Sequence, residues 1–252
     1  MSIVRIQQKV FDIDGIIFDK DDTLIEFDAL WGPRTSQWVD ALAISLALNG
    51  NFKNELFSLL GYLPENARTR AESPLAVASL DTLYTLAGGV ISRYGPSWHE
   101  ARSHAISCAQ TTLLADFAPT EIVTKGNVAK VMHQLTEAHI RIAIVTSDDR
   151  QMTEATLSFL GISDLISVII CGDDPVPNKP APDALWAISE QLGIEPSRMM
   201  MVGDMISDMQ FANNAGVAYR VGVASHSDNI LALTAQADEI ITSIDEIIVE
   251  GG

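Results

Sequence analysis

Two aspartates two residues apart, Asp19 and Asp21, stand where a short apolar run ends, and Thr23 follows them. In an extended segment residues i and i+2 point to the same side, so both carboxylates would emerge together. Two neighbouring negative charges need a cation, and Mg²⁺ prefers oxygen ligands and also neutralises an incoming phosphate. One aspartate could then attack phosphorus while the other moves protons. The pair therefore predicts a phosphoryl-transfer site.

Polar side chains also follow later apolar segments that we expect to form buried strands. They are Thr146, Ser147 and Asp148 after residues 140–145, Lys179 near the strand at 165–170, and Asp204 with Asp208 after residues 199–202. In a parallel α/β sheet, functional groups gather at the carboxyl ends of the strands. A nucleophile, a hydroxyl group, a cation and metal-binding acids are the parts that phosphoryl transfer requires.

The elements that must position these residues alternate along the chain. From Val123 onward, apolar runs of strand length are separated by segments with helical periodicity, which is typical of a parallel sheet with helices on its faces. We therefore predict an α/β fold with a doubly wound parallel sheet. The segment 27–117 has helix-like stretches and little strand character, so we predict an inserted all-helical cap domain there. The α/β core would then consist of residues 1–26 and 118–252.

Composition limits the function classes. The 252 residues carry 33 acidic and 16 basic side chains, a formal charge of −17, so the long-range field repels nucleic acid and anionic membranes. Hydrophobic residues make up 47% of the chain and charged residues 19%, a globular composition. We expect no membrane span and no signal segment at the N-terminus. Cys108 and Cys171 form no close-spaced pair, which favours a reducing compartment, and we predict a cytoplasmic protein.

Taken together, these motifs resemble the haloacid dehalogenase superfamily, in particular its phosphatase branch with a helical cap, such as the phosphoglycolate phosphatases. The family's motifs match in order: Asp19, Asp21 and Thr23, then Thr146, then Lys179 within Lys-Pro-Ala-Pro-Asp, then Gly203-Asp204 with Asp208. The resemblance covers nearly the whole chain and implies a Rossmann-like core. It implies a phosphatase that hydrolyses a small phosphate monoester through an aspartyl-phosphate.

The resemblance also implies a role for each matching residue. Asp19 would attack phosphorus, and Asp21 would protonate the leaving oxygen and later deprotonate water. Thr146, Ser147 and Lys179 would bind the phosphoryl oxygens. Mg²⁺ would be bound by the side chains of Asp19 and Asp204 and the backbone carbonyl of Asp21, with Asp208 close by. The identity of Asp21 favours a phosphatase or mutase, since related ion pumps usually have Thr there and the dehalogenases proper lack an aspartate.

Two residues depart from the family pattern. Asp22 stands where the family usually has Gly, so the turn after the nucleophile must accept a side chain, and Asp is among the residues least penalised at positive φ. Asp148 adds a negative charge near the phosphate site, where a neutral residue would help more. Upstream, Asp12 and Asp14 share the spacing of the first motif, but Ile16 follows where a Thr or Val would be expected. We interpret this earlier pair as a polar lead-in to the strand.

Substrate choice would depend on the cap, because the motif residues contact only the phosphate. Arg68 and Arg70, in a loop-like stretch between predicted cap helices, are candidates to contact an anionic leaving group, and Arg34 is a weaker one. The alternative is that they are ordinary surface arginines. Alternative functions are a sugar phosphomutase with the same chemistry and, from a different class, a phospho-accepting signalling module. Such a module would be much shorter and would lack a helical cap.

Overall fold

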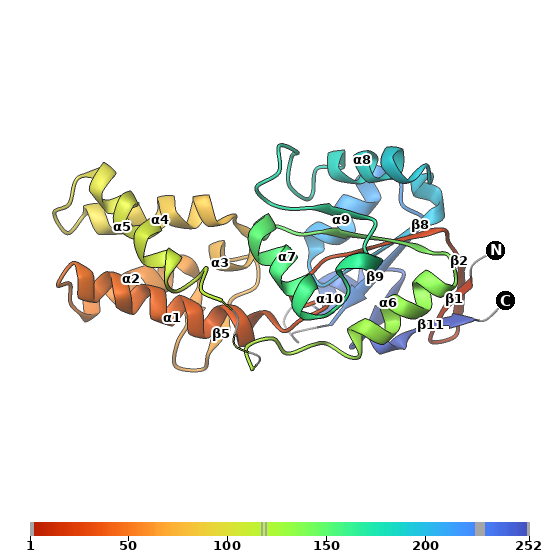
Figure 1. The fold of residues 1–252 in the computed structure, drawn as a ribbon, viewed down its shortest axis with the longest axis horizontal. Coiled ribbons are helices and arrows are strands. Elements are labelled where there is room, and N and C mark those ends of the chain that lie inside the picture. The colour runs from red at the N-terminus through yellow and green to blue at the C-terminus, as the bar shows by residue number, and fades with distance from the viewer. Residues whose placement is uncertain (1–2, 117, 119, 225–229, 251–252) are drawn as a thin grey trace. The chain divides into compact units, whose positions relative to one another are not determined.

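The computed structural model of the chain describes residues 3–250 apart from residues 117, 119 and 225–229 (Figure 1). The chain forms two compact units, one made of Met1–Glu26 with Thr124–Gly252 and the other of Phe27–Val123. The predicted return to the core after residue 117 falls on a residue outside the described part of the chain. The second unit extends to Val123, and Glu121 near its end pairs with Arg34 of the same unit.

The first unit is built on a six-stranded sheet with the order β10-β9-β8-β3-β6-β7, in which every pair of neighbours is parallel. Its strands are β3 (Gly15–Phe18), β6 (Arg141–Val145), β7 (Val168–Ile170), β8 (Met199–Gly203), β9 (Tyr219–Val223) and β10 (Glu239–Ile241). The central strand β3 is buried along its whole length, which explains its continuous apolar run. This arrangement confirms the predicted doubly wound α/β fold.

Helices cover both faces of this sheet. They are α6 (Val128–Glu137), α7 (Arg150–Phe159), α8 (Asp183–Leu192), α9 (Ile206–Ala215) and α10 (Ile230–Thr234). On one face Ile17, Ala143 and Met201 of the strands pack with Leu185 of α8 and Phe211 of α9. Figure 1 shows α8 above the sheet and α6 below it. Because successive side chains of a strand point to opposite faces, the buried strands β3, β6 and β8 supply apolar side chains to both faces.

A second, smaller sheet joins the two ends of the first unit. Strands β1 (Ile3–Ile6), β2 (Lys9–Asp12) and β11 (Ile247–Glu250) pair antiparallel in the order β11-β1-β2. Asp12 at the end of β2 and Asp14 just after it both form ion pairs with Arg198, at 2.8 Å each. The upstream Asp-x-Asp pair therefore belongs to a structural ion-pair cluster, in agreement with its interpretation as a lead-in to β3.

The second unit is mostly helical, with α1 (Phe27–Ser45), α2 (Gly50–Leu60), α3 (Pro74–Val77), α4 (Leu80–Ser92) and α5 (Trp98–Gln110). It also contains a short hairpin, β4 (Tyr62–Leu63) and β5 (Arg68–Thr69), which the expectation of an all-helical insert did not include. The hairpin follows because Gly61 ends α2 with a φ of 82°, a left-handed conformation that suits glycine. Asp28 then holds it, accepting a hydrogen bond from the Thr69 N–H at 2.9 Å.

In the described part of the chain, no helix combines the length and the hydropathy needed to cross a membrane.

Candidate active site

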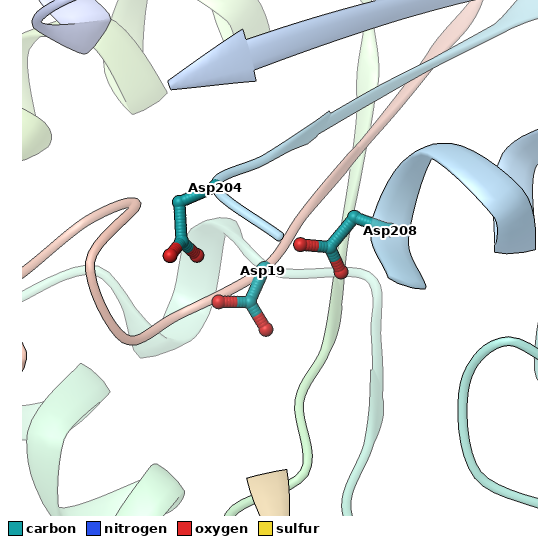
Figure 2. A group of neighbouring side chains, drawn as sticks. All are labelled: Asp19, Asp204 and Asp208. Carbon is teal, nitrogen blue, oxygen red and sulfur yellow. The ribbon is translucent and has the colours of Figure 1, made fainter. Parts of the chain in front are cut away.

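Asp19 lies directly after the central strand β3, on the side of the sheet where the carboxyl ends of β6 and β8 also lie. Its N–H donates to the Val202 carbonyl of β8 at 2.9 Å, which continues the parallel pairing past the end of β3. Asp204 follows β8, and Asp208 lies in the first turn of α9. Figure 2 shows the three carboxyl groups gathered together, and ligand oxygens from all three lie within 4.8 Å of one another.

These three carboxyl groups are buried, with exposed fractions of 7% for Asp19, 5% for Asp204 and 0% for Asp208. Burial, together with the charges of Asp208 and Asp21, raises the pKa of Asp19 to about 7 although Lys179 opposes the shift. Burial and the charges of Asp19 and Asp208 raise the pKa of Asp204 well above its ordinary value. Three oxygen donors whose mutual repulsion is only partly compensated fit a hard divalent cation.

Lys179 provides a cation between two of these acids. Its Nζ lies 2.7 Å from Asp19 Oδ1 and 2.6 Å from Asp208 Oδ1, and it donates to the Val145 carbonyl at 3.1 Å. Burial would lower the pKa of Lys179, but the two carboxylate charges outweigh burial and raise it. The lysine is therefore charged at neutral pH and is held against the predicted nucleophile.

Asp208 also satisfies the helix that carries it. Its Oδ2 accepts a hydrogen bond from the Met205 N–H at 3.0 Å, at the start of α9, while its Oδ1 faces Lys179. The sequence left open whether this residue serves the site or caps a helix, and in the structure its two oxygens do both. Gly203 makes this possible, because a Cβ at that position would lie 2.4 Å from the Asp208 carboxyl carbon.

Thr146 and Ser147 follow β6, whose carboxyl end lies next to that of β3. Thr146 directly follows β6, is 4% exposed, and its Oγ1 accepts from the Asp148 N–H at 3.1 Å. The backbone of Ser147 packs against Gly172, where a Cβ would lie 2.1 Å from the Ser147 carbonyl oxygen. Thr23 is fully buried and its hydroxyl lies 3.4 Å from Asp204 Oδ1. The second motif thus ends at the same edge of the sheet as the first and the fourth.

Asp21 has a different partner from the one that its spacing suggested. The extended segment ends at Asp19, and a turn follows in which the N–H groups of Leu24 and Ile25 both donate to the Lys20 carbonyl. The Asp21 side chain lies 2.7 Å from Lys20 Nζ, whereas the cluster in Figure 2 contains Asp19, Asp204 and Asp208. The carboxylates of the two motif aspartates are therefore not side by side in the way that a continuous strand would impose.

Lys20 was not among the predicted site residues, yet its side chain is fully buried between two carboxylates. Its Nζ lies 2.7 Å from Asp21 Oδ2 and 3.0 Å from Asp148 Oδ2. Asp148, the unexplained departure in the second motif, thus pairs with a buried lysine. The signal in the sequence was the extra acid at Asp148, which needs a nearby cation once it is buried.

The other departure, Asp22, lies in the turn after the nucleophile with a φ of 54°. The turn therefore requires positive φ, and Asp meets this requirement without glycine, as expected from its tolerance of the left-handed region.

The cap arginines belong to the second unit, so their place relative to these acids stays a prediction. Arg68 lies in β5 and Arg70 just after it, and both are exposed. The weaker candidate, Arg34, is only 2% exposed and is bound within its own unit. It pairs with Glu121 at 3.0 Å and donates to the carbonyl oxygens of Leu113, Ala115 and Asp116. Arg34 is thus a structural residue, and the prediction that it contacts a leaving group is wrong.

Fold and site together define a class: α/β proteins with an inserted helical unit and an acidic centre, steadied by a lysine, at the carboxyl ends of the central strands. The family described as haloacid dehalogenase-like hydrolase matches residues 13–216, and the chain belongs to this family. The resemblance inferred from the motifs is therefore confirmed.

Individual relatives agree with this assignment. The chain is 33% identical over 150 residues to a phosphoglycolate phosphatase of Yersinia pestis, covering 54% of this chain and 65% of that protein, slightly less than two thirds of its length. It is 28% identical over 217 residues to the phosphoglycolate phosphatase of Escherichia coli strain K12, covering 82% and 80%. The fold is shared with the solved structure of a HAD phosphatase from Thermococcus onnurineus, with a TM-score of 0.62, 20% identity and coverage of 93% and 95%.

Proposed function

We propose that the protein is a Mg²⁺-dependent phosphatase that hydrolyses a small phosphate monoester through an aspartyl-phosphate intermediate. The observation that carries this proposal is the convergence of Asp19, Asp204 and Asp208 with Lys179, all buried at one edge of the sheet. Phosphoryl transfer depends mainly on positioning and on neutralising charge, and this group supplies both. The phosphatase names of the curated relatives support the same reaction class.

The residues divide the reaction between them. Asp19 attacks phosphorus, the bond to the leaving oxygen breaks with its electron pair, and Asp21 gives its proton to that oxygen. Asp21 then takes a proton from water, the water oxygen attacks the same phosphorus, and the bond to Asp19 breaks to release phosphate and the free carboxylate. Thr146, Ser147 and Lys179 hold the phosphoryl oxygens during both steps. The enzyme ends in the protonation state in which it began.

The carboxylates of Asp19 and Asp204, with Asp208 close by and the backbone carbonyl of Asp21, would hold the divalent cation. Bound there, Mg²⁺ would neutralise the charge that the phosphate brings to an acidic protein. Its binding requires that these carboxyl groups be ionised, so the raised pKa of Asp19 and Asp204 also makes affinity depend on pH.

The substrate class that fits is a small organic phosphate monoester of the phosphoglycolate type. The names of several curated relatives support this choice. Arg68 and Arg70 are exposed cations on the inserted unit and would meet an anionic leaving group, such as a carboxylate. This role distinguishes them from the motif residues, which would contact the phosphate alone.

Substitution of Asp19 by Asn tests the proposal. The wild type should hydrolyse an activated aryl phosphate only when Mg²⁺ is added, and Asp19→Asn should lose this activity while it stays folded. The matched control is Asp12→Asn, which changes the same residue type in the upstream pair bound to Arg198 and should keep the activity. Near wild-type turnover by a folded Asp19→Asn variant would contradict the nucleophile assignment.

Product analysis separates the alternatives. A panel of phosphorylated metabolites, assayed with and without Mg²⁺, should release free phosphate; an isomerised sugar phosphate would instead indicate a phosphomutase. Stable labelling of the protein by a small phosphodonor without turnover would indicate a phospho-accepting module. The unit inserted at Phe27–Val123 favours an enzyme over such a module. A phospho-accepting module would be shorter and would lack this second unit.

A further inference from the structure

Lys20 lies inside the first motif, between the predicted nucleophile and the predicted general acid, and its side chain is fully buried. Lysine is almost never fully buried unless it is paired. Two carboxylates face it, Asp21 Oδ2 at 2.7 Å and Asp148 Oδ2 at 3.0 Å, with exposed side-chain fractions of 16% and 7%. The site thus contains two lysines, each between two carboxylates, and the mechanism above uses only Lys179.

Asp148 is itself fixed by the backbone at the end of β6. Its N–H donates to Thr146 Oγ1 at 3.1 Å, and its Oδ1 accepts from the Asp149 N–H at 2.8 Å. The other oxygen, Oδ2, is the one that faces Lys20. The end of β6 therefore positions the ammonium group of Lys20 through Asp148, and the same strand end carries Thr146, which would bind the phosphoryl group.

The two carboxylate oxygens of Asp21 also have different surroundings. Oδ2 forms an ion pair with Lys20 Nζ, which makes no hydrogen bond to either carboxylate, whereas Oδ1 is buried and has no hydrogen-bond partner among the described residues. A buried carboxyl oxygen without a partner is costly unless a ligand supplies one. If Asp21 protonates the leaving group, Oδ1 is the oxygen that remains available for this proton transfer.

We infer that Lys20 and Asp148 form a clamp that holds the Asp21 carboxyl group by one oxygen, so that the other is directed at the leaving-group oxygen. Lys20 and Asp148 are thus positioning residues for the general acid, in a chain whose first and second motifs both depart from the family pattern. The inference rests on the proposed phosphatase function, because it assigns Asp21 the role of proton donor.

A purely structural role is the competing explanation, in which Lys20 serves only to neutralise Asp148. The two explanations differ in one double variant. Lys20→Met/Asp148→Asn removes both charges of the pair, so neither a buried lysine nor a buried aspartate is left without its partner. If the pair is only structural, this variant works like the wild type; if it positions Asp21, the proton donor is no longer held.

The readout is the leaving-group dependence of the first turnover, measured as release of the alcohol or phenol in a rapid-quench experiment with Mg²⁺. An alkyl phosphate needs a proton on its departing oxygen, whereas p-nitrophenyl phosphate needs this far less. General acid catalysis contributes about 10²- to 10⁴-fold, so Asp21→Asn should lower the alkyl-to-aryl rate ratio by about 100-fold or more. A merely structural defect would lower both rates together and leave the ratio unchanged.

For Lys20→Met/Asp148→Asn we expect the ratio to fall at least about tenfold, the lower part of what general acid catalysis supplies, with a thermal midpoint close to that of the wild type. The control variant Lys53→Met/Asp40→Asn removes an exposed ion pair of the same residue types and should keep the wild-type ratio. A smaller change in the Lys20/Asp148 double variant overturns the inference. If Asp21→Asn itself leaves the ratio unchanged, the proposed role of Asp21 fails, which is a distinct result.

Discussion

Replacement of Asp19 by Asn should abolish turnover and, in the absence of metal, stabilise the catalytic unit. Burial and neighbouring acids raise the pKa of Asp19 from 3.8 to about 7. Each pKa unit corresponds to about 1.4 kcal/mol, so ionised Asp19 costs the folded state about 4 kcal/mol. Asn has nearly the same shape without the charge, but it is a weaker acceptor for Lys179. The cost of about 4 kcal/mol is an upper bound on the gain from removing the charge. We expect about half of it, a net gain of about 2 kcal/mol in the free energy of unfolding.

The stability difference between Asp19→Asn and the wild type should depend on pH. Because the pKa of Asp19 is higher in the folded than in the unfolded state, the folded wild type holds more protons between about pH 4 and pH 7. Its stability therefore falls as the pH rises through this window, and the full cost is present above it. Asp19→Asn does not titrate, so its advantage should be largest at about pH 7.5 and should disappear near pH 4.

Hydrogen exchange is the suitable assay, since it reports on one unit of a two-unit chain. Peptides that cover β3 and β8 would be followed by mass spectrometry through a urea titration in EDTA, at two pH values. The control is Asp14→Asn, with the opposite sign: hydrogen bonds from Arg198 lower the pKa of Asp14, so its small contribution is present at neutral pH and is lost on acidification. The reasoning is refuted if Asp19→Asn is less stable than the wild type at neutral pH without metal.

Further predictions concern three other contacts. Glu121→Gln should destabilise the inserted unit by about 2 kcal/mol at neutral pH, because buried Arg34 loses a charged partner and one of its two acceptor oxygens there. Burial opposes the shift, but Arg34 lowers the pKa of Glu121, so the difference from the wild type should vanish as the pH falls below the ordinary pKa of 4.5, as followed by hydrogen exchange in α1. Gly203→Ala should reduce turnover by about 100-fold or more, the scale expected when a catalytic group is misplaced, because the new Cβ displaces the Asp208 carboxylate. Its control, Gly89→Ala in α4, meets no atom within 4 Å and should keep full activity. Asp204→Asn should weaken Mg²⁺ binding at least about tenfold in calorimetry, since a donor is lost from the carboxylate cluster; unchanged affinity would place the cation elsewhere.

The sheet and much of the candidate site could be predicted because their signals are local. The apolar runs at β3, β6 and β8 are buried strands, and the polar residues after each run lie at one edge because parallel strands end together. Asp19, Thr146, Asp204 and Asp208 were predicted in this way, and Lys179 was predicted from the segment after β7. Their neighbourhood follows from topology, even though residues 19 and 204 are far apart in the sequence.

The features that the sequence analysis missed depend on distant partners. Strand β1 is only four residues long and is completed by Ile247–Glu250 at the other end of the chain. Lys20 resembles any surface lysine until Asp148 is placed next to it by the pairing of β3 with β6. The hairpin of the inserted unit consists of two-residue strands, which are too short to give a periodic signal. In each case the sequence of one segment does not reveal its structure until the segment that it contacts is known.

The position of β3 in the sheet also has a consequence for biosynthesis. Gly15 pairs with Arg141 on one side and with Met199 on the other, so both neighbours of this buried strand are translated after the whole of Phe27–Val123. At about 5–20 residues per second, the strand that carries the nucleophile waits several seconds for its first partner. The inserted unit can complete its own core during this interval, while an apolar segment remains unpaired on the nascent chain. Because Asp19 follows the central strand, the candidate site cannot be completed before β8 has been translated.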